Sequence, residues 1–333
     1  MDFGDYVVTP SLVDCHTHLL EYAPTSIYPV THSTHLMGGI SLLLKALSSG
    51  VTALGEQICG HPQSDFNKDD YMGVIEDLPI DIVFSLSSIS IGLDNIVSFT
   101  GVTGSKVLVN DMLVDKNINT QLAILSEYPG ENLFVNATPA NLEEKYVPRA
   151  GEIMYSQEEL VRIVSIFHKL NRKIGCHVAG KEAIEMAIHA GFDVIHHGHE
   201  MTDEQLLKVK DKNIMIVATP LGGTHLPPNR AEDIVKMIQE GITLAISTDG
   251  YLPPSNKAPW LQFDDNSLKG PESLMYLANP SMKQLDTLGY DENDILKLIT
   301  LNPAIILGKD DVYGNLEIDK EANFLVTKGI PGL

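Results

Sequence analysis

The sequence is poor in cysteine, in tryptophan and in positive charge. Its 333 residues include three cysteines and one tryptophan, and 23 lysines and arginines stand against 44 aspartates and glutamates, a formal net charge of −21. Three cysteines are too few for a disulfide framework, which indicates a reducing, cytoplasmic setting. A surface this acidic repels phosphate backbones and anionic lipid, so we expect neither nucleic acid nor a membrane surface as a partner.

Long apolar runs are also lacking. No run reaches the roughly 18 residues needed to span a bilayer, and the first ten residues lack the basic region and apolar core of a signal peptide. Hydrophobic residues make up 44% and charged residues 20% of the chain, which is ordinary for a globular protein. The length is sufficient to bury a large core and suits either two domains or one large α/β barrel.

Short apolar or β-branched runs alternate with helical patterns along the chain. The predicted strands cover residues 11–18, 51–56, 81–88, 132–138, 173–178, 192–197, 213–219 and 242–248. The helical patterns between them include residues 38–49, 157–171, 181–190, 203–212 and 231–240. Three glycines, Gly50, Gly191 and Gly241, follow such patterns where a left-handed residue ends a helix. Eight units predict a closed parallel (β/α)₈ barrel, with a doubly wound open sheet as the alternative.

The fourth unit is the ambiguous part of this pattern. An extra extended run over residues 105–111 could be the true fourth strand or an inserted hairpin. Two further helical patterns follow the eighth strand, and residues 315–329 read as extended. We expect a barrel over residues 1–310 and a short extended tail over residues 311–333.

Two histidines end the first predicted strand. In the run DCHTH, His16 and His18 share one face of the strand while Cys15 and Thr17 take the other. Two imidazoles at the rim of a barrel can bind one divalent ion, and neutral imidazole suits Zn²⁺. The alternative is a pair of polar rim histidines without a metal.

Further candidate ligands follow the fifth, sixth and eighth predicted strands. They are His177, then His196 or His197, and then Asp249. Strand parity does not decide between His196 and His197. Of the 12 histidines, only His168 and His189 fall inside helical patterns; the others lie at or beyond strand carboxyl ends, where barrel enzymes build their sites.

These residues lie in motifs that resemble those of the amidohydrolase superfamily. The run TPSLVDCHTHL resembles its first-strand signature, and HVAGKEAIEMAIHAGFDVIHHG resembles the passage from strand five to strand six in its prolidase-like and imidazolonepropionase-like branch. ISTDG resembles the strand-eight aspartate motif, and LITLNPAIILG with GNLEIDKEANFLV resembles the closing segment. The resemblance extends from residue 7 to about residue 328.

The resemblance implies a role for each matched position. It makes His16, His18, His177 and His197 metal ligands, and Asp249 both a ligand and the general base. His197 is chosen over His196 because it immediately precedes Gly198, and His197 is also expected to stabilise the oxyanion of the reaction. Cys15 and Cys176 are then expected to point outward toward the helices. The implied cofactor is a divalent metal, most simply one Zn²⁺.

Three departures from the family pattern qualify this expectation. Binuclear members carry a strand-four lysine or glutamate, where this chain has Phe134; Lys106 would serve if residues 105–111 form that strand, and only then are two ions expected. Deaminating members usually have a glutamate at the position of Gly180, so hydrolysis is favoured over deamination. The chain also starts almost at strand one, so the usual small β-sandwich is expected to be missing or reduced.

The sequence therefore predicts a metal-dependent hydrolase that cleaves an amide or cyclic amide C–N bond, a dipeptide bond included, in a small molecule. A deaminase of heterocyclic amines and a non-catalytic barrel scaffold are the alternatives. The resemblance leaves assembly into a homo-oligomer open. Candidate substrate-binding side chains on the loops are Tyr155, Arg149, His225, Arg230 and His199, with Glu56, Gln57, His61 and Glu200 as further pocket residues. Arg230 could clamp a substrate carboxylate, or stand solvated at a helix start.

Overall fold

The computed structural model describes residues 2–20, 31–59, 69–87, 113–137, 151–250 and 270–333. The run 105–111, and with it Lys106, lies outside these residues, as do Arg149 and His61. Among the described helices, none combines the length and the apolar character needed to cross a bilayer.

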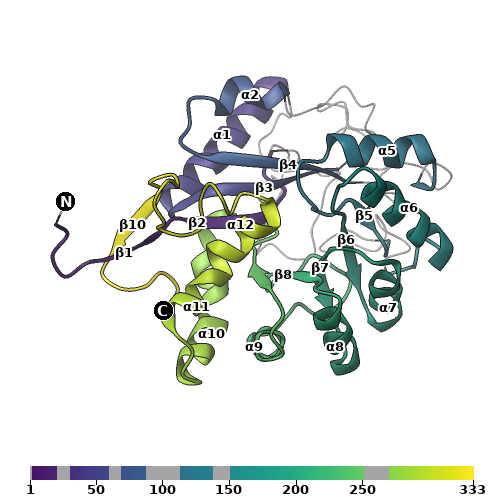
Figure 1. The fold of residues 1–333 in the computed structure, drawn as a ribbon. Coiled ribbons are helices and arrows are strands. Elements are labelled where there is room, and N and C mark those ends of the chain that lie inside the picture. Colours follow the sequence, from purple (N-terminus) through teal and green to yellow (C-terminus); the bar gives the residue numbers. More distant parts are fainter. Residues whose placement is uncertain (1, 21–30, 60–68, 88–112, 138–150, 251–269) are drawn as a thin grey trace.

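Eight strands of the described chain build a parallel barrel in sequence order (Figure 1). They form one sheet of three strands and one of five: β2 (Leu12–Thr17), β3 (Val51–Cys59) and β4 (Asp81–Ser87), then β5 (Leu133–Phe134), β6 (Gly175–Ala179), β7 (Val194–His199), β8 (Met215–Ala218) and β9 (Leu244–Ile246). A parallel bridge from Thr17 to Gly250 joins the outer edges of the two sheets. The predicted barrel is confirmed, and each predicted strand is present.

The second seam of the barrel is closed by side chains. Between β4 and β5, the Nδ2 amide of Asn132 donates to the Leu86 carbonyl at 3.1 Å, and the Leu86 N–H donates to Ser126 Oγ at 3.0 Å. The strand β5 itself is only two residues long, and pairs Leu133 with Cys176 and Phe134 with His177.

Helices follow the strands and cover the outside of the barrel. They are α1 (His32–Ser48), α2 (Asp69–Ile75), α5 (Lys116–Leu125), α6 (Gln157–Lys169), α7 (Lys181–Ala190), α8 (Asp203–Asp211) and α9 (Ala231–Gln239), then α10 (Leu274–Thr287), α11 (Glu292–Leu296) and α12 (Leu301–Leu307), with 3₁₀ turns η3 (Pro271–Ser273) and η4 (Lys297–Ile299). Helix α6 shows why the pattern was readable. Ser156 and Glu159 form a capping box, and Leu160, Ile163 and Phe167 are buried at the spacing of one helix face.

The carboxyl-terminal residues return to the start of the chain. Strand β10 (Phe324–Thr327) pairs antiparallel with β1 (Val7–Pro10), and Figure 1 shows this two-stranded sheet beside the barrel near the amino terminus. This pairing includes part of the predicted extended tail.

Two apolar clusters divide the core into an outer and an inner layer. The larger cluster packs helices onto the outward side chains of the strands, and Cys176 belongs to it. The smaller one contains Val13, Cys15, Val83 and Val194 from three different strands and fills the barrel interior. Cys176 thus points outward as expected, whereas Cys15 points inward, with its Sγ 3.2 Å from Ser247 Oγ. The expectation for Cys15 was wrong because the β2–β3 register shifts between Asp14 and Thr17, which breaks the alternation.

Candidate metal centre

Backbone pairing brings the first-strand histidines to Asp249. The Asp249 N–H donates to the His16 carbonyl at 3.0 Å, and the His18 N–H donates to the Gly250 carbonyl at 3.2 Å. Asp249 Oδ1 consequently lies 3.3 Å from Nε2 of His16 and 3.3 Å from Nε2 of His18. These three side chains are buried and could hold one metal ion together.

A second group of imidazoles lies on strands β6 and β7. The β6–β7 register shifts after Val178, and His197 has a left-handed φ of 69°. This bulge turns His197 inward directly after His196, which also faces the interior. Both histidines are therefore buried inside the barrel, and His197 is the one that lies beside His177, with 4.4 Å between the ring centroids.

One carboxylate connects the two groups, and it is Glu131. Its Oε1 lies 2.6 Å from Nδ1 of His177 and 2.7 Å from Nε2 of His197. Its Oε2 lies 3.4 Å from Nε2 of His16 and 3.5 Å from Nε2 of His18. The carboxylate therefore lies between the β2 and the β6–β7 histidines, where it could touch ions on both sides.

Sequence reasoning missed Glu131. It was sought at the carboxyl end of the fourth strand, where Phe134 instead stacks on His177 with ring centroids 4.3 Å apart. Glu131 lies before β5, in the buried turn of residues 128–131, which enters the barrel interior. The available signal was a carboxylate in the run YPGEN immediately ahead of an apolar strand. The position of Lys106 is not described, so its role as a ligand stays untested.

Hydrogen bonds hold this turn and the adjacent loop in place. Gln57 Oε1 accepts from the Glu131 N–H at 3.0 Å, and the Gln57 amide donates to the Tyr128 hydroxyl. Glu56, also proposed as a pocket residue, accepts from Leu19 N–H at 3.1 Å and Leu20 N–H at 2.7 Å. Gln57 therefore positions Glu131, and Glu56 fixes the chain beyond His18.

The electrostatics of the cluster favour a cation. Burial raises the pKa of Glu131, but His16 and His177 outweigh it and hold the pKa well below its usual range. Burial likewise opposes ionisation of Asp249, yet His16 and His18 keep its pKa below the ordinary value. Burial lowers the pKa of His16, but Glu131 and Asp249 raise it overall to about 9. A metal ion that binds His16 would displace this proton, so metal binding would release it to solvent.

The residues present fit a divalent metal. Nε2 of His16 and Nε2 of His177 are buried and make no hydrogen bond within the described part of the chain. Two carboxylates and four imidazoles converge, with no lysine or arginine of the described residues paired to them, and oxygen with imidazole nitrogen is a donor set that suits Zn²⁺.

The substrate-binding candidates are placed around this centre rather than in it. His199 is fully buried, with Nδ1 2.7 Å from Thr224 Oγ1 and Nε2 3.3 Å from Thr219 Oγ1. Tyr155 is also buried, and His225 is exposed with its ring against Gly151. Gly180, where deaminating members carry a glutamate, is the N-cap of α7 with a φ of 84°.

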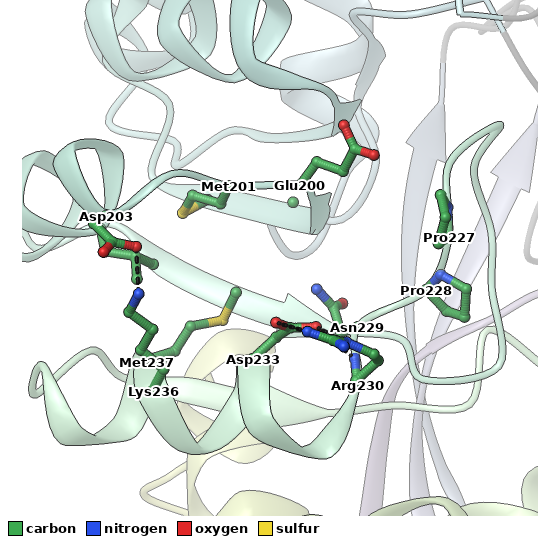
Figure 2. A pocket seen from close by; sticks show the side chains of 12 residues that line it. Glu200, Met201, Asp203, Pro227, Pro228, Asn229, Arg230, Asp233, Lys236 and Met237 are labelled. Carbon is green, nitrogen blue, oxygen red and sulfur yellow. Dashed lines mark hydrogen bonds and ion pairs between the residues drawn. The ribbon is translucent and has the colours of Figure 1, made fainter.

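Arg230 lines a pocket of about 450 Å³ between the starts of α8 and α9 (Figure 2). Apolar side chains, among them Met201 and Met237, line part of it, and so does Gly198, which follows His197 in the chain. Nε of Arg230 lies 3.2 Å from Asp233 Oδ2 at the start of α9. Arg230 therefore occupies a helix start in this structure, where it lines this pocket.

The histidines and carboxylates gather at the carboxyl ends of the strands of a closed parallel barrel, which is the face where barrel enzymes place their active sites. The family comparison is more specific: the amidohydrolase family model matches residues 7–331, and the chain belongs to that family.

The matched relatives are distant. The chain is 26% identical over 176 residues to the imidazolonepropionase of Fusobacterium nucleatum, a stretch that covers 52% of this chain and 38% of that protein. It thus spans about two fifths of the length of this curated relative.

Solved structures resemble the whole chain at low identity. A prolidase complexed with N-methylphosphonate-L-proline matches with a TM-score of 0.69 and 15% identity, covering 100% of this chain and 82% of that one. A Xaa-Pro dipeptidase with bound methionine matches with a TM-score of 0.70 and 16% identity, covering 98% and 82%. An ochratoxinase from A. niger matches with a TM-score of 0.66 and 18% identity, covering 96% and 76%. At these identities the likeness shows the barrel fold.

Proposed function

We propose that this protein is a metal-dependent hydrolase that cleaves an amide or cyclic amide C–N bond of a small molecule. The observation that carries the proposal is the convergence of His16, His18, His177, His197 and Asp249 around Glu131. Membership of the amidohydrolase family and the similarity to a prolidase, a Xaa-Pro dipeptidase and an imidazolonepropionase support the same bond class. Buried, free Cys15 and Cys176 are consistent with the cytoplasmic setting that forms part of this proposal.

We further propose two divalent ions, most simply Zn²⁺, in place of the single ion expected from the sequence. His16, His18 and Asp249 would hold one ion, and His177 and His197 the other, with one oxygen of Glu131 toward each pair of histidines. The two carboxylates, both ionised, would supply the negative charge that such a pair of cations needs.

The mechanism assigns the proton transfers to Asp249. Ions held by these residues would lower the pKa of a bound water from about 15.7 to about 7 and polarise a carbonyl oxygen. Asp249 accepts the proton that the attacking water loses as its oxygen bonds to the carbonyl carbon. Asp249 then gives that proton to the leaving nitrogen as the C–N bond breaks. In this mechanism His197 is a metal ligand, because its Nε2 faces Glu131 and its Nδ1 is hydrogen-bonded to Thr219 Oγ1 at 2.7 Å.

The test is an activity screen on the zinc-loaded protein with N-acyl amino acids, dipeptides ending in proline and small cyclic amides. We expect hydrolysis of at least one class, and a loss of about 10³-fold or more in Asp249→Asn and His16→Ala, because each change removes a ligand and Asp249 also carries the proton. Wild-type turnover in Asp249→Asn would contradict the mechanism. Release of ammonia from amino-heterocycles without amide hydrolysis would favour the deaminase alternative.

Arg230 remains the candidate for a substrate carboxylate because it borders the pocket beside Gly198. We predict that Arg230→Ala raises KM about tenfold or more for a substrate with a free carboxylate and leaves kcat nearly unchanged, because uniform binding is lost. The exposed Arg162→Ala on α6 is the control and should leave both constants unchanged. An unchanged KM in Arg230→Ala would remove Arg230 from the substrate site.

A further inference from the structure

Two of the proposed ligands, His16 and His197, are each held by a relay of two hydrogen bonds. In both relays the first partner is a side chain, His196 or Thr219, and the last partner is a backbone carbonyl. A carbonyl oxygen accepts hydrogen bonds and never donates them. The direction of each relay, and the position of every proton in it, therefore follows from its end.

The first relay runs from Pro129 to His16. Nε2 of His196 lies 3.0 Å from the Pro129 carbonyl, so it carries the hydrogen and donates. Nδ1 of His196 is then the acceptor of the neutral ring, and it lies 2.8 Å from Nδ1 of His16. Nδ1–H of His16 donates to it, and the nitrogen of His16 that faces Glu131 and Asp249 is Nε2.

The second relay runs from Gly222 to His197. Thr219 Oγ1 lies 2.6 Å from the Gly222 carbonyl, so its single hydrogen is donated there. Oγ1 therefore accepts from Nδ1–H of His197 at 2.7 Å, and the other ring nitrogen, Nε2, faces Glu131 Oε1 at 2.7 Å. The outcome is the same as in the first relay, reached with a hydroxyl in place of an imidazole.

We propose that His196 and Thr219 are positioning residues, which hold His16 and His197 protonated at Nδ1 so that each presents Nε2 to a divalent cation. The proposal rests on the metal centre proposed above. Partners that fix the tautomer and ring orientation of a ligand histidine typically change metal affinity by 10–100-fold when they are lost.

The relays also end in segments that build the site. Pro129 precedes Glu131 by two residues in the same turn, and Gly222 is followed by Gly223, whose added Cβ would lie 2.3 Å from both Asp249 Oδ2 and His197 Cε1. The turn that contains Pro129 and the loop that contains Gly222 therefore each have two functions. Each packs beside or carries a proposed carboxylate ligand, and each determines which nitrogen of a proposed histidine ligand carries the proton. Sequence parity had left His196 as a rival to His197; in this arrangement it serves the other ligand group.

Zinc affinity, measured by competition with a chelator on the full chain, tests the proposal with paired variants. His196→Leu and Thr219→Val keep similar volume and remove the relay, and each should weaken zinc binding by about 10–100-fold. His196→Asn keeps a neutral acceptor near the place of Nδ1, and Thr219→Ser keeps the hydroxyl, so both should stay within a few-fold of wild type. If wild type, His196→Leu and Thr219→Val bind zinc with equal affinity, this inference is overturned while the proposed function stands. A wild-type protein that binds no zinc overturns the proposed function and the inference with it.

Nitrogen-15 NMR of the histidine-labelled, zinc-loaded wild type provides a readout that does not depend on variants folding. We expect the attached protons of His16 and His197 on Nδ1 and that of His196 on Nε2. His196→Leu should expose the His16 Nδ1–H to exchange with solvent, and His196→Asn should restore its protection. If His196 had a purely structural role, His196→Leu would change the melting temperature alone. A proton on Nδ1 of His196 in the wild type overturns the proposal.

Discussion

Gly223 packs closely against two proposed ligands, Asp249 and His197. A Cβ at this position would meet Asp249 Oδ2 and His197 Cε1 at 2.3 Å, and its φ of 110° is one that side chains rarely adopt. We predict that Gly223→Ala lowers kcat/KM by about 100-fold or more, because a displacement of about 1 Å in a catalytic group is enough for that loss. Steady-state kinetics with the metal content measured in parallel is the check.

Gly191→Ala is the matched control for this change. Gly191 also has a left-handed φ, 87°, but an added Cβ there meets nothing within 4 Å. It should cost about 1 kcal/mol of stability through backbone strain and leave turnover unchanged. If Gly223→Ala behaves like Gly191→Ala, the contact with Asp249 and His197 is not important for the reaction.

At the scale of single residues, the sequence identified every proposed ligand except one. His16, His18, His177 and Asp249 could be found because each lies in the carboxyl-terminal part of a strand with readable apolar residues or shortly after it. Glu131 was missed, because it lies in a turn inside the barrel, where the alternation rule does not apply. Its role depends on where the turn folds, and that is decided by packing.

The turn of residues 128–131 packs tightly against β6 at Gly175 and against β3 at Gly130. A Cβ on Gly175 would lie 2.0 Å from the Gly130 carbonyl oxygen, and one on Gly130 would lie 2.5 Å from Gln57 Oε1. We predict that Gly175→Ala destabilises the protein by about 1–3 kcal/mol, because the contact is with backbone that cannot rotate away, and that it lowers metal affinity by moving Glu131. Denaturant unfolding and metal titration measure the two effects.

Gly73→Ala in α2 is the control for this substitution. Its added Cβ meets nothing within 4 Å and its backbone is helical, so the change should be neutral or stabilising by up to about 1 kcal/mol. Equal stability of Gly175→Ala and Gly73→Ala would contradict the tight packing of the turn.

At the scale of elements, the sequence predicted the eight strands and most helices because their patterns are regular. Helix α6 has both a capping box and one apolar face. Strand alternation was insufficient where the register is irregular: it gave the wrong direction for Cys15 beside the shift in β2, and it left the choice between His196 and His197 open at the bulge in β7. A bulge inserts one extra residue into a strand, so the side chains after it change faces. The alternating pattern of the sequence does not show where this happens. Both irregularities occur next to proposed ligands.

The barrel as a whole closes through buried polar contacts between β2 and the chain after β9. Asp14 Oδ2 accepts from the Thr248 hydroxyl at 2.6 Å, and Asp14 Oδ1 accepts from the Thr248 N–H at 3.2 Å. We predict that Thr248→Val destabilises the protein by about 1–3 kcal/mol because Asp14 is left with an unmet hydrogen bond in the interior. Thr327→Val, which removes an exposed hydroxyl contact on β10, should cost less than about 0.5 kcal/mol. Similar losses in both variants would contradict a special role for this closure.

The same contact predicts a pH dependence of stability. Burial raises the pKa of Asp14 to about 6 from 3.8, although the Thr248 hydrogen bonds oppose the shift. The folded state therefore holds this proton longer than the unfolded state, and stability falls as the pH rises from about 4 through 6. In the metal-free protein, the unfolding free energy of wild type relative to Asp14→Asn should fall over that range, on the order of 2 kcal/mol. A difference in unfolding free energy that stays constant or rises with pH would contradict a raised pKa of the buried Asp14 carboxyl.

The central claim is that one carboxylate, Glu131, joins two groups of histidines into a single metal centre at the mouth of the barrel. Anomalous diffraction at the zinc edge from zinc-loaded crystals tests it directly. We expect two peaks, one on each side of the Glu131 carboxylate, the first bounded by His16, His18 and Asp249 and the second by His177 and His197. No peak among these side chains, or zinc bound without contact to Glu131, would contradict it.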